Sequence, residues 1–255
     1  MTQPARVSSI GRDPTPIWVR IGGVLQEVPG GRRHGPANRP PPGGPWTELR
    51  IGGRLCGWAR EPEHGRAAAR QAEHLAQQLS DEGRTRLIER LGHKLRSSLL
   101  ALRELTRQSA YGRPVSVEDI NDLAFEVGRR AEGLELLAVE PRDEQRAVVL
   151  GAVLNLAAPG AHRSVPTQAR VAASEPSLLQ ALSRTYDWLG GAGSCFSAAA
   201  SGDWWQLRLE PASERPPLPV PELGEPLIRL LVETRLGGWF DPEDGGPASI
   251  YLPAA

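Results

Sequence analysis

The sequence predicts an α+β protein with three parts: a small β domain, a long helical hairpin and a mixed α/β domain. Three patterns in its 255 residues support this prediction. A β-rich phrase with paired glycines occurs twice near the N-terminus, a proline-free run of strong helix formers follows, and strand-like and helix-like segments then alternate. We therefore place the domains at residues 1–62, 63–140 and 141–255.

Composition and charge narrow the class of protein. With 40% hydrophobic residues the chain can bury a core, and its 30 basic and 30 acidic residues give a formal net charge of zero. A neutral chain lacks the positive field that attracts a phosphate backbone, so nucleic acid is not the expected partner. The most apolar stretch, residues 147–158, is far shorter than a membrane span, and the N-terminus has no apolar signal segment. We expect a cytoplasmic protein without a membrane span.

Neither the cysteines nor the histidines show the spacing of metal ligands. Cys56 and Cys195 lie far apart in the sequence and indicate ordinary buried thiols. The acidic segment 241–246 is interpreted as a solvated turn, with a calcium loop as the alternative. We expect no metal site, because the histidines other than His93 are scattered along the sequence: His34, His64, His74 and His162.

Two glycine-containing phrases indicate β-hairpins. Residues 17–28 read IWVRIGGVLQEV and residues 47–59 read TELRIGGRLCGWA, in which paired glycines supply the positive φ of a tight turn. Two hairpins can form a four-stranded sheet, and the proline- and glycine-rich segment 29–45 between them is expected to be a loop. This domain is interpreted as a reduced sensory or docking domain. Its core is expected to hold three tryptophans, with a ligand cage as the alternative: Trp18, Trp46 and Trp58.

A long helix is predicted from Glu63 onward, with a hinge near Gly83. Its apolar residues recur at steps of three and four and form one stripe: Leu87, Ile88, Leu91, Leu95, Leu99, Leu102 and Leu105. After a turn at 111–114, residues 116–119 fit a capping box that opens a second helix. The stripe of that helix comprises Ile120, Leu123, Val127, Ala131 and Leu134. Two helices cannot bury both stripes alone, so we expect a homodimer that forms a four-helix bundle.

The chain beyond Pro141 indicates a mixed α/β layer. Helices are predicted at residues 143–156, 177–189 and 223–234. Strands are predicted at residues 168–172, 204–209 and 248–252. This order predicts helices packed on one face of an antiparallel or mixed sheet.

His93 is the candidate reactive residue of the long helix. At about 100° per residue it lies about 200° from Leu91, almost opposite the apolar stripe, so its imidazole is expected to face solvent. A phosphate on that imidazole would find guanidinium partners nearby. The alternative is a histidine on a solvated charged face, which is the commoner case. The polar residues that share its side of the helix are Arg86, Glu89, Arg90, Arg96 and Ser97.

The residues around His93 decide between these alternatives. The segment His93-Lys94-Leu95-Arg96-Ser97-Ser98-Leu99 resembles the phosphoacceptor box of sensor histidine kinases, commonly His-Glu-Leu-Arg-Thr-Pro-Leu. The hairpin up to residue 138 is similar to the dimerisation and phosphotransfer module of that family, and residues 175–182 resemble the start of the nucleotide helix of its ATP domain. The closing segments 223–233, 237–238, 245–246 and 252–253 are similar as well. The resemblance covers residues 63–255 and implies a C-terminal α/β sandwich of the ATP-binding type.

This sequence departs from the family beside the histidine. The acidic residue that primes the family's histidine is Lys94 here, and a charged lysine cannot accept a proton. The small polar residue that the family uses in phosphatase chemistry is Ser97, which keeps a hydroxyl but has no amide. The resemblance implies that His93 is the phosphoacceptor and that Arg96 and Ser97 orient the phosphate.

The nucleotide site departs further from the family. Two asparagines that hold the Mg²⁺-triphosphate correspond to Ser183 and Asp187, of which Asp187 could ligate Mg²⁺. The Asp-x-Gly-x-Gly loop reads EPASER at 210–215, the lid segment is short, and Gly224 alone remains of the phosphate loop. Without glycines the backbone cannot approach phosphates closely, so Asp187 and Gly224 are interpreted as remnants. We expect no tightly bound cofactor, and ATP with Mg²⁺ only if the chain is an active kinase.

Three functions are compatible with these observations. In the first, the protein is a two-component phosphotransfer protein or pseudokinase, in which His93 exchanges a phosphoryl group with the aspartate of a response regulator receiver domain. That partner would dock around His93 and Leu100 and would supply the carboxylate and Mg²⁺. In the second, the protein is an active, divergent ATP-dependent sensor histidine kinase. In the third, it is a non-enzymatic dimeric scaffold that binds a kinase or a response regulator.

Overall fold

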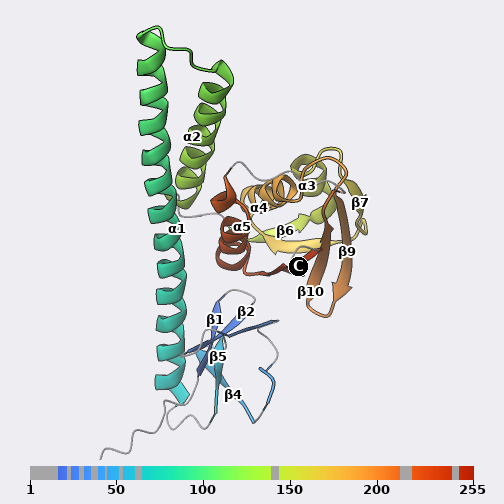
Figure 1. The fold of residues 1–255 in the computed structure, drawn as a ribbon. Helices are drawn as coiled ribbons and strands as arrows, with labels where there is room; N and C mark the ends of the chain where they lie inside the picture. Colours follow the sequence, from blue (N-terminus) through green and yellow to red (C-terminus); the bar gives the residue numbers. More distant parts are fainter. Residues whose placement is uncertain are drawn as a thin grey trace, which may run out of the picture. The chain divides into compact units, whose positions relative to one another are not determined.

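Two compact units make up the chain: Met1–Arg20 with Leu25–Ala76, and Ile21–Val24 with Gln77–Ala255. The structure is a computed structural model. It describes residues 17–21, 24–28, 32–35, 40–43, 45–51, 54–60, 65–138, 144–212, 220–242 and 247–255. Helices and sheets are both present, so the predicted α+β composition is confirmed (Figure 1). No helix of the described residues has both the length and the apolar content that crossing a bilayer requires.

The first unit contains a five-stranded sheet in the order β3-β2-β1-β5-β4. Its strands are β1 (Ile17–Ile21), β2 (Val24–Val28), β3 (Arg33–His34), β4 (Thr47–Ile51) and β5 (Arg54–Ala59). The prediction of two hairpins is confirmed, but the segment expected to be only a loop contributes β3. Arg32 makes a bidentate ion pair with Glu27 at 2.5 and 2.6 Å and its carbonyl accepts the amide hydrogen of Glu27, which ties β3 to β2.

Tryptophan packing forms the core of this sheet, as predicted. Trp18 and Trp58 are buried with Leu25 and Leu55, and Trp46 packs against them. The Trp18 and Trp46 rings meet edge to face with centroids 6.5 Å apart. Aromatic pairs favour this edge-to-face geometry, so packing in the core is a sufficient structural role for these tryptophans.

Two long helices follow, α1 (Gly65–Ala110) and α2 (Val117–Ala138), joined by a short turn. The predicted hinge at Gly83 is wrong, because α1 continues through that residue. A glycine costs a helix only about 1 kcal/mol, and the adjacent Arg84 donates a hydrogen bond to the carbonyl of Leu137 at 2.9 Å. The predicted cap of α2 is confirmed, since the Ser116 hydroxyl accepts hydrogen bonds from the amides of Glu118 and Asp119.

The apolar stripes of the hairpin are buried at one end and exposed at the other. Leu87 and Leu91 are buried, whereas Leu99 is 47% exposed and the stripe residues Leu123 and Val127 of α2 are only half-buried. On α2 the predicted stripe residue Ala131 is exposed, and its neighbour Arg130 is buried instead. The exposed end is therefore an apolar surface that nothing in the described residues covers.

The C-terminal layer of the second unit is built on a five-stranded sheet in the order β11-β12-β10-β9-β7. Its strands are β7 (His162–Ser164), β9 (Cys195–Ser201), β10 (Trp204–Glu210), β11 (Trp239–Pro242) and β12 (Ala248–Pro253). A second, two-stranded sheet pairs β6 (Arg146–Val149) with β8 (Arg170–Ala173). The helices of this layer are α3 (Leu150–Ala157), α4 (Glu175–Trp188) and α5 (Glu225–Leu230) (Figure 1).

Sequence patterns predicted part of this layer. The elements β8, α4, β10 and β12 are confirmed, whereas β7, β9 and β11 were missed. The predicted helix at 143–156 is wrong at its start, because the β-branched Val148 and Val149 pair with β8 as part of β6. The predicted helix at 223–234 divides into a 3₁₀ turn (Pro221–Leu223), α5 and a π-helical turn (Leu231–Arg235).

One apolar core joins the base of the hairpin to this layer. Leu87, Leu91 and Leu137 belong to the same buried cluster as the helices and strands that follow residue 144. A Cβ built on Gly133 would lie 2.4 Å from Cδ2 of Leu223, so α2 approaches the 3₁₀ turn as closely as a glycine permits. The last turns of α2 are thus packed against the C-terminal layer.

Candidate functional site

His93 lies on the solvent side of α1, as its position in the helix predicted. Its side chain is exposed, and so are those of Lys94, Arg96 and Ser97. Arg90, one turn before Lys94, is exposed too, so cationic groups flank the imidazole along the helix. A phosphoryl group on the imidazole would carry negative charge, which guanidinium groups stabilise through charge-assisted hydrogen bonds.

Ser97 lies one turn after His93 and is already hydrogen-bonded. Its hydroxyl donates to the backbone carbonyl of His93 at 3.1 Å. Such a bond from residue i to residue i−4 is common for serine in helices. The hydroxyl can therefore contact a phosphate on His93 only by accepting a proton or by giving up this bond, which leaves Arg96 as the stronger phosphate ligand.

A buried polar cluster around Ser98 of α1 and Arg130 of α2 lies inside the hairpin, and it was not predicted from the sequence. Arg130 donates hydrogen bonds to Ser98 at 2.8 Å and to Glu126 at 2.7 Å. Arg130 and Ser98 occupy core positions of α2 and α1 at the spacing of the apolar stripes. The signal in the sequence was that Ser98 and Arg130 fall in phase with the flanking leucines.

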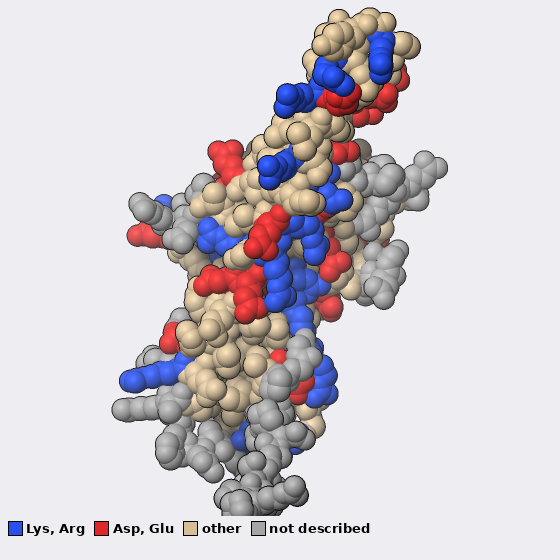
Figure 2. All heavy atoms as spheres, turned by 60° about the vertical axis from the view of Figure 1, so that its left-hand side comes forward, with Lys and Arg blue, Asp and Glu red and all other residues tan. Residues whose placement is uncertain are grey.

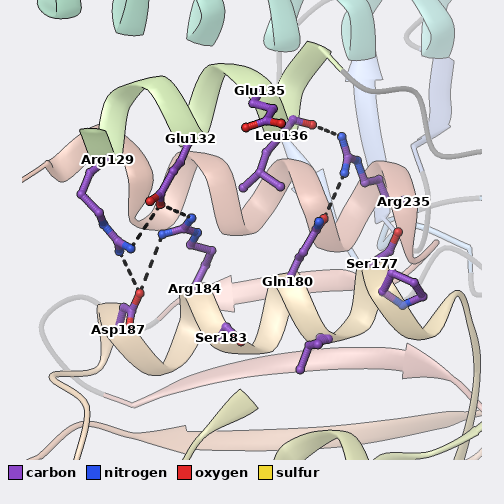
Figure 3. A pocket seen from close by; sticks show the side chains of 12 residues that line it. Arg129, Glu132, Glu135, Leu136, Ser177, Gln180, Ser183, Arg184, Asp187 and Arg235 are labelled. Carbon is purple, nitrogen blue, oxygen red and sulfur yellow. Dashed lines mark hydrogen bonds and ion pairs between the residues drawn. The ribbon is translucent and has the colours of Figure 1, made fainter. Parts of the chain in front are cut away.

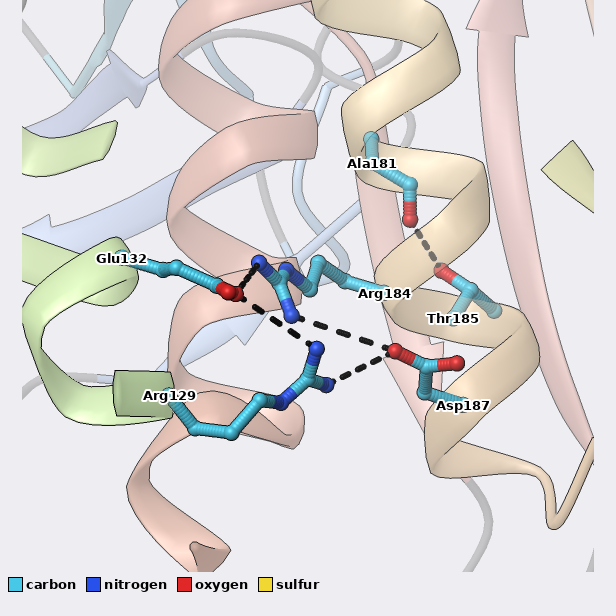
Figure 4. A network of polar contacts seen from close by, with 6 residues as sticks. All are labelled: Arg129, Glu132, Ala181, Arg184, Thr185 and Asp187. Carbon is cyan, nitrogen blue, oxygen red and sulfur yellow. Dashed lines mark hydrogen bonds and ion pairs between the residues drawn. The ribbon is translucent and has the colours of Figure 1, made fainter. Parts of the chain in front are cut away.

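Asp187 on α4 is paired with arginines. Its carboxylate lies 2.8 Å from Nη2 of Arg129 and 3.9 Å from Nη1 of Arg184 (Figure 4). The second predicted position, Ser183, lies one turn earlier on the same face of α4 (Figure 3). A hard divalent cation needs carboxylate oxygens that are not already neutralised, so this arrangement does not fit a Mg²⁺-triphosphate.

Gly224 does not fit a phosphate site either. It is buried and precedes α5, which has six residues. Its amide hydrogen is donated to the carbonyl of Pro221 at 3.1 Å, and its own carbonyl accepts the amide of Ile228 at 3.0 Å. With its amide engaged, the glycine has no donor to offer a phosphate.

A cavity of about 620 Å³ lies between the face of α4 that carries Asp187 and the last turns of α2. Figure 3 shows α2 residues on one side of this cavity and α4 residues on the other. The lining residues include Glu132, Glu135, Ser177, Gln180, Ser183 and Arg235. Helix α2 therefore covers the helix face that the resemblance assigns to nucleotide.

Charge at the surface is mixed in sign. Figure 2 shows basic and acidic side chains interspersed on the face that it displays. Among the described residues no group of three or more His, Cys, Asp and Glu side chains is placed to hold a metal ion. His93 is thus an exposed imidazole with cationic neighbours on its helix, while Asp187 and Gly224 lie on other elements and are engaged in internal contacts.

Comparisons with known proteins find similarity among solved structures. No protein-family model and no curated protein matches the sequence. The structure of Acinetobacter baumannii histidine kinase AdeS is similar over 63% of this chain and 97% of its own, with 17% identity and a TM-score of 0.49. Histidine kinase ThkA, solved in complex with the response regulator protein TrrA, is similar over 94% of this chain and 79% of its own, with 13% identity and a TM-score of 0.49.

A third similar structure is the histidine kinase domain of the E. coli osmosensor EnvZ. It is similar over 46% of this chain and 92% of its own, with 14% identity and a TM-score of 0.31. Each of these three solved structures is of a histidine kinase.

Proposed function

We propose that this protein is a phosphotransfer protein of two-component signalling, in which His93 exchanges a phosphoryl group with an aspartate of a response regulator receiver domain. The observation that supports this proposal most directly is the exposure of His93 with Arg90, Lys94 and Arg96 close by on α1. The sequence of the box around His93 supports it independently.

The chemistry of this exchange needs little from the chain itself. A ring nitrogen of His93 attacks the phosphorus of an aspartyl phosphate, the N–P bond forms as the acyl P–O bond breaks, and the aspartate leaves as a carboxylate. Arg96 would stabilise the charge on the transferring group. The receiver domain would supply the carboxylate and its own Mg²⁺, so the reaction does not depend on Asp187.

Transfer from ATP is disfavoured by two features. Lys94 occupies the position where the family has an acidic residue, whose carboxylate acts as a base toward the histidine. The charged ammonium of a lysine cannot act as a base. The Asp187 carboxylate is held by Arg129 and Arg184, and the amide of Gly224 is engaged. We therefore propose that the C-terminal layer is a pseudokinase domain.

Dimerisation is part of the proposal. Besides Leu100, which lies on the proposed docking face, four exposed apolar side chains occur on the hairpin: Leu99, Tyr111, Val117 and Phe125. A second hairpin would cover this surface and complete a four-helix bundle.

Phosphoryl transfer can be tested with receiver domains from the same organism, each charged with a radiolabelled small phosphodonor. We expect one of them to transfer label to the full chain, in a bond that resists alkali and breaks in acid, as phosphohistidine does. His93→Gln should abolish the label, while His74→Gln, which changes another exposed histidine of α1, should leave it unchanged.

Other outcomes of the same experiment separate the alternatives. Label that enters the chain from ATP alone would show an active kinase and overturn the pseudokinase assignment. A receiver that binds the chain but never transfers label, to the wild type or to any variant, would identify a scaffold. If label is transferred to the wild type, Arg96→Ala should slow labelling about tenfold. Ser97→Ala should slow it by less than about threefold, because the Ser97 hydroxyl is hydrogen-bonded to the helix backbone.

A further inference from the structure

Two buried indole N–H groups of the N-terminal sheet have no hydrogen-bond acceptor among the described residues. They are Nε1 of Trp18 in β1 and Nε1 of Trp46, which directly precedes β4. Trp18 is 5% exposed, and Trp46 is half-buried with its Nε1 atom out of reach of solvent. The centroids of the two rings are 6.5 Å apart, so packing explains the rings but not the two N–H groups.

A buried donor without an acceptor destabilises a folded protein, because it has lost its hydrogen bonds to water and gained none in return. Buried polar groups are therefore nearly always paired, and each exception needs an explanation. Two such donors on neighbouring rings indicate that a group from outside the chain binds at this place. Indole can only donate, so the bound group must offer lone pairs.

A cation and a third aromatic ring lie beside the two indoles. The guanidinium of Arg60 lies over the Trp46 ring, 4.6 Å from its centroid, and donates a hydrogen bond to the carbonyl of Gly43. The imidazole of His34 meets the Trp18 ring edge to face, with centroids 6.4 Å apart. Arg60 is exposed, and His34 and Trp46 are half-buried, so a small molecule can reach this side of the cluster from solvent.

The charges around the indoles favour a carboxylate as the missing acceptor. Its two oxygens can accept from both N–H groups at N···O distances of about 2.9 Å. Arg60 attracts a negative charge and repels an ammonium group, which disfavours the alternative of a cation held between aromatic rings. The two acidic side chains of the five strands, Glu27 and Glu48, are each paired with an arginine and so oppose an anion only weakly.

We propose that Trp18, Trp46 and Arg60 form a binding site for a small aromatic carboxylate. The two indole N–H groups donate to the carboxylate, Arg60 supplies the opposite charge, and the aromatic rings pack against the flat apolar body of the ligand. All three residues belong to the first compact unit, so the site depends neither on His93 nor on a dimer. The N-terminal sheet would thus respond to a small acid, a role separate from phosphoryl transfer.

Nuclear magnetic resonance on the full chain, with isotope-labelled indoles, tests this site. Each of the seven tryptophans gives one indole N–H signal, and the spectra of Trp18→Phe and Trp46→Phe assign the two signals of the site. Benzoate, phenylacetate and indoleacetate would be titrated in turn. At least one of these acids should move both signals downfield, as a new hydrogen bond does, with a Kd of about 1 mM or tighter.

Matched controls separate the carboxylate from the ring that carries it. The primary amide of the same acid keeps the ring and a carbonyl but loses the charge, and should bind about tenfold more weakly. Arg60→Gln should weaken the acid about tenfold and leave the amide unchanged, whereas Arg50→Gln on the same sheet should change neither. Trp204 of the C-terminal layer is also buried without an acceptor among the described residues, and its signal should stay in place.

The comparison of acid with amide is made on the wild type, so it holds even if a tryptophan variant fails to fold, which circular dichroism would reveal. The proposal is overturned if none of the three acids moves the two signals, or if acid and amide bind equally well. Magnetisation transfer from water to both indoles, with no response to the acids, would identify buried water as the acceptor and would overturn it too.

Discussion

Arg130 of α2 donates a hydrogen bond from Nη1 to Oγ of Ser98 on α1, at 2.8 Å, across the interior of the hairpin. Arg130 is 6% exposed and Ser98 is 8% exposed. Glu126 accepts a second bond from the same guanidinium nitrogen, whereas Nε of Arg130 is buried without an acceptor among the described residues. The hairpin therefore contains one charged layer between apolar layers.

Ser98→Ala and Arg130→Met should have different effects on stability. Ser98→Ala removes an acceptor from a buried guanidinium and should lower the free energy of unfolding by about 1–3 kcal/mol. Arg130→Met removes the buried charge and leaves Glu126 partly exposed to water, so it should leave stability unchanged or raise it by about 1 kcal/mol. Urea denaturation followed by circular dichroism measures both. Ser97→Ala is the neighbouring control, and equal losses in Ser98→Ala and Ser97→Ala would contradict the assignment of a buried layer.

Two glycines of α2 should respond differently to alanine. At Gly128 an added Cβ meets no atom within 4 Å, so Gly128→Ala should stabilise the helix by up to about 1 kcal/mol. At Gly133 the added Cβ would lie 2.4 Å from buried Leu223, so overpacking outweighs the gain in helix propensity. We expect Gly133→Ala to lower the free energy of unfolding by about 1 kcal/mol. Stabilisation by both substitutions would show that α2 does not pack closely on the 3₁₀ turn.

The exposed apolar end of the hairpin should govern the oligomeric state. Leu99→Arg places a charge in the uncovered stripe and should convert dimers to monomers at concentrations where the wild type is dimeric, as sedimentation velocity would show. Leu156→Arg changes an exposed leucine of α3, which is 68% exposed, and should leave the dimer intact. A monomeric wild type would refute the predicted four-helix bundle.

Acid should loosen the N-terminal sheet through one ion pair. Hydrogen bonds from Arg32 hold the pKa of the Glu27 carboxyl below its ordinary value of 4.5. A lowered pKa in the folded state means that the contribution is complete above that ordinary value and is lost as the pH falls towards the folded pKa. Glu27→Gln should weaken the sheet at neutral pH and flatten this acid response.

The indole N–H signals of Trp18, Trp46 and Trp58 in nuclear magnetic resonance spectra would follow the sheet through the acid range. Glu48→Gln, in the exposed ion pair with Arg50, is the control on the same sheet. An acid response that is equal in Glu27→Gln and in the wild type would assign the loosening to other groups.

Much of the fold could be predicted from local sequence patterns. The glycine pairs and the tryptophans predicted the N-terminal hairpins and their core, and the three-to-four spacing of leucines predicted both long helices and the exposed position of His93. These features depend on residues within one or two turns of each other, so periodicity suffices. Strand β7 was missed because it has only three residues and forms by pairing with β9, which is distant in the sequence.

The sequence by itself determined which residue is the candidate phosphoacceptor and what its neighbours on the helix are. His93, Lys94, Arg96 and Ser97 share one stretch of helix, and their exposure follows from helical geometry. Only the tertiary structure decided the state of Asp187, because its partner Arg129 lies 58 residues away in the chain. Only the fold shows that Arg130, not Ala131, enters the core, since burial depends on which surface the C-terminal layer and the opposite helix cover. Ion pairing and close packing are properties of surfaces brought together by folding, and spacing along the chain does not encode them.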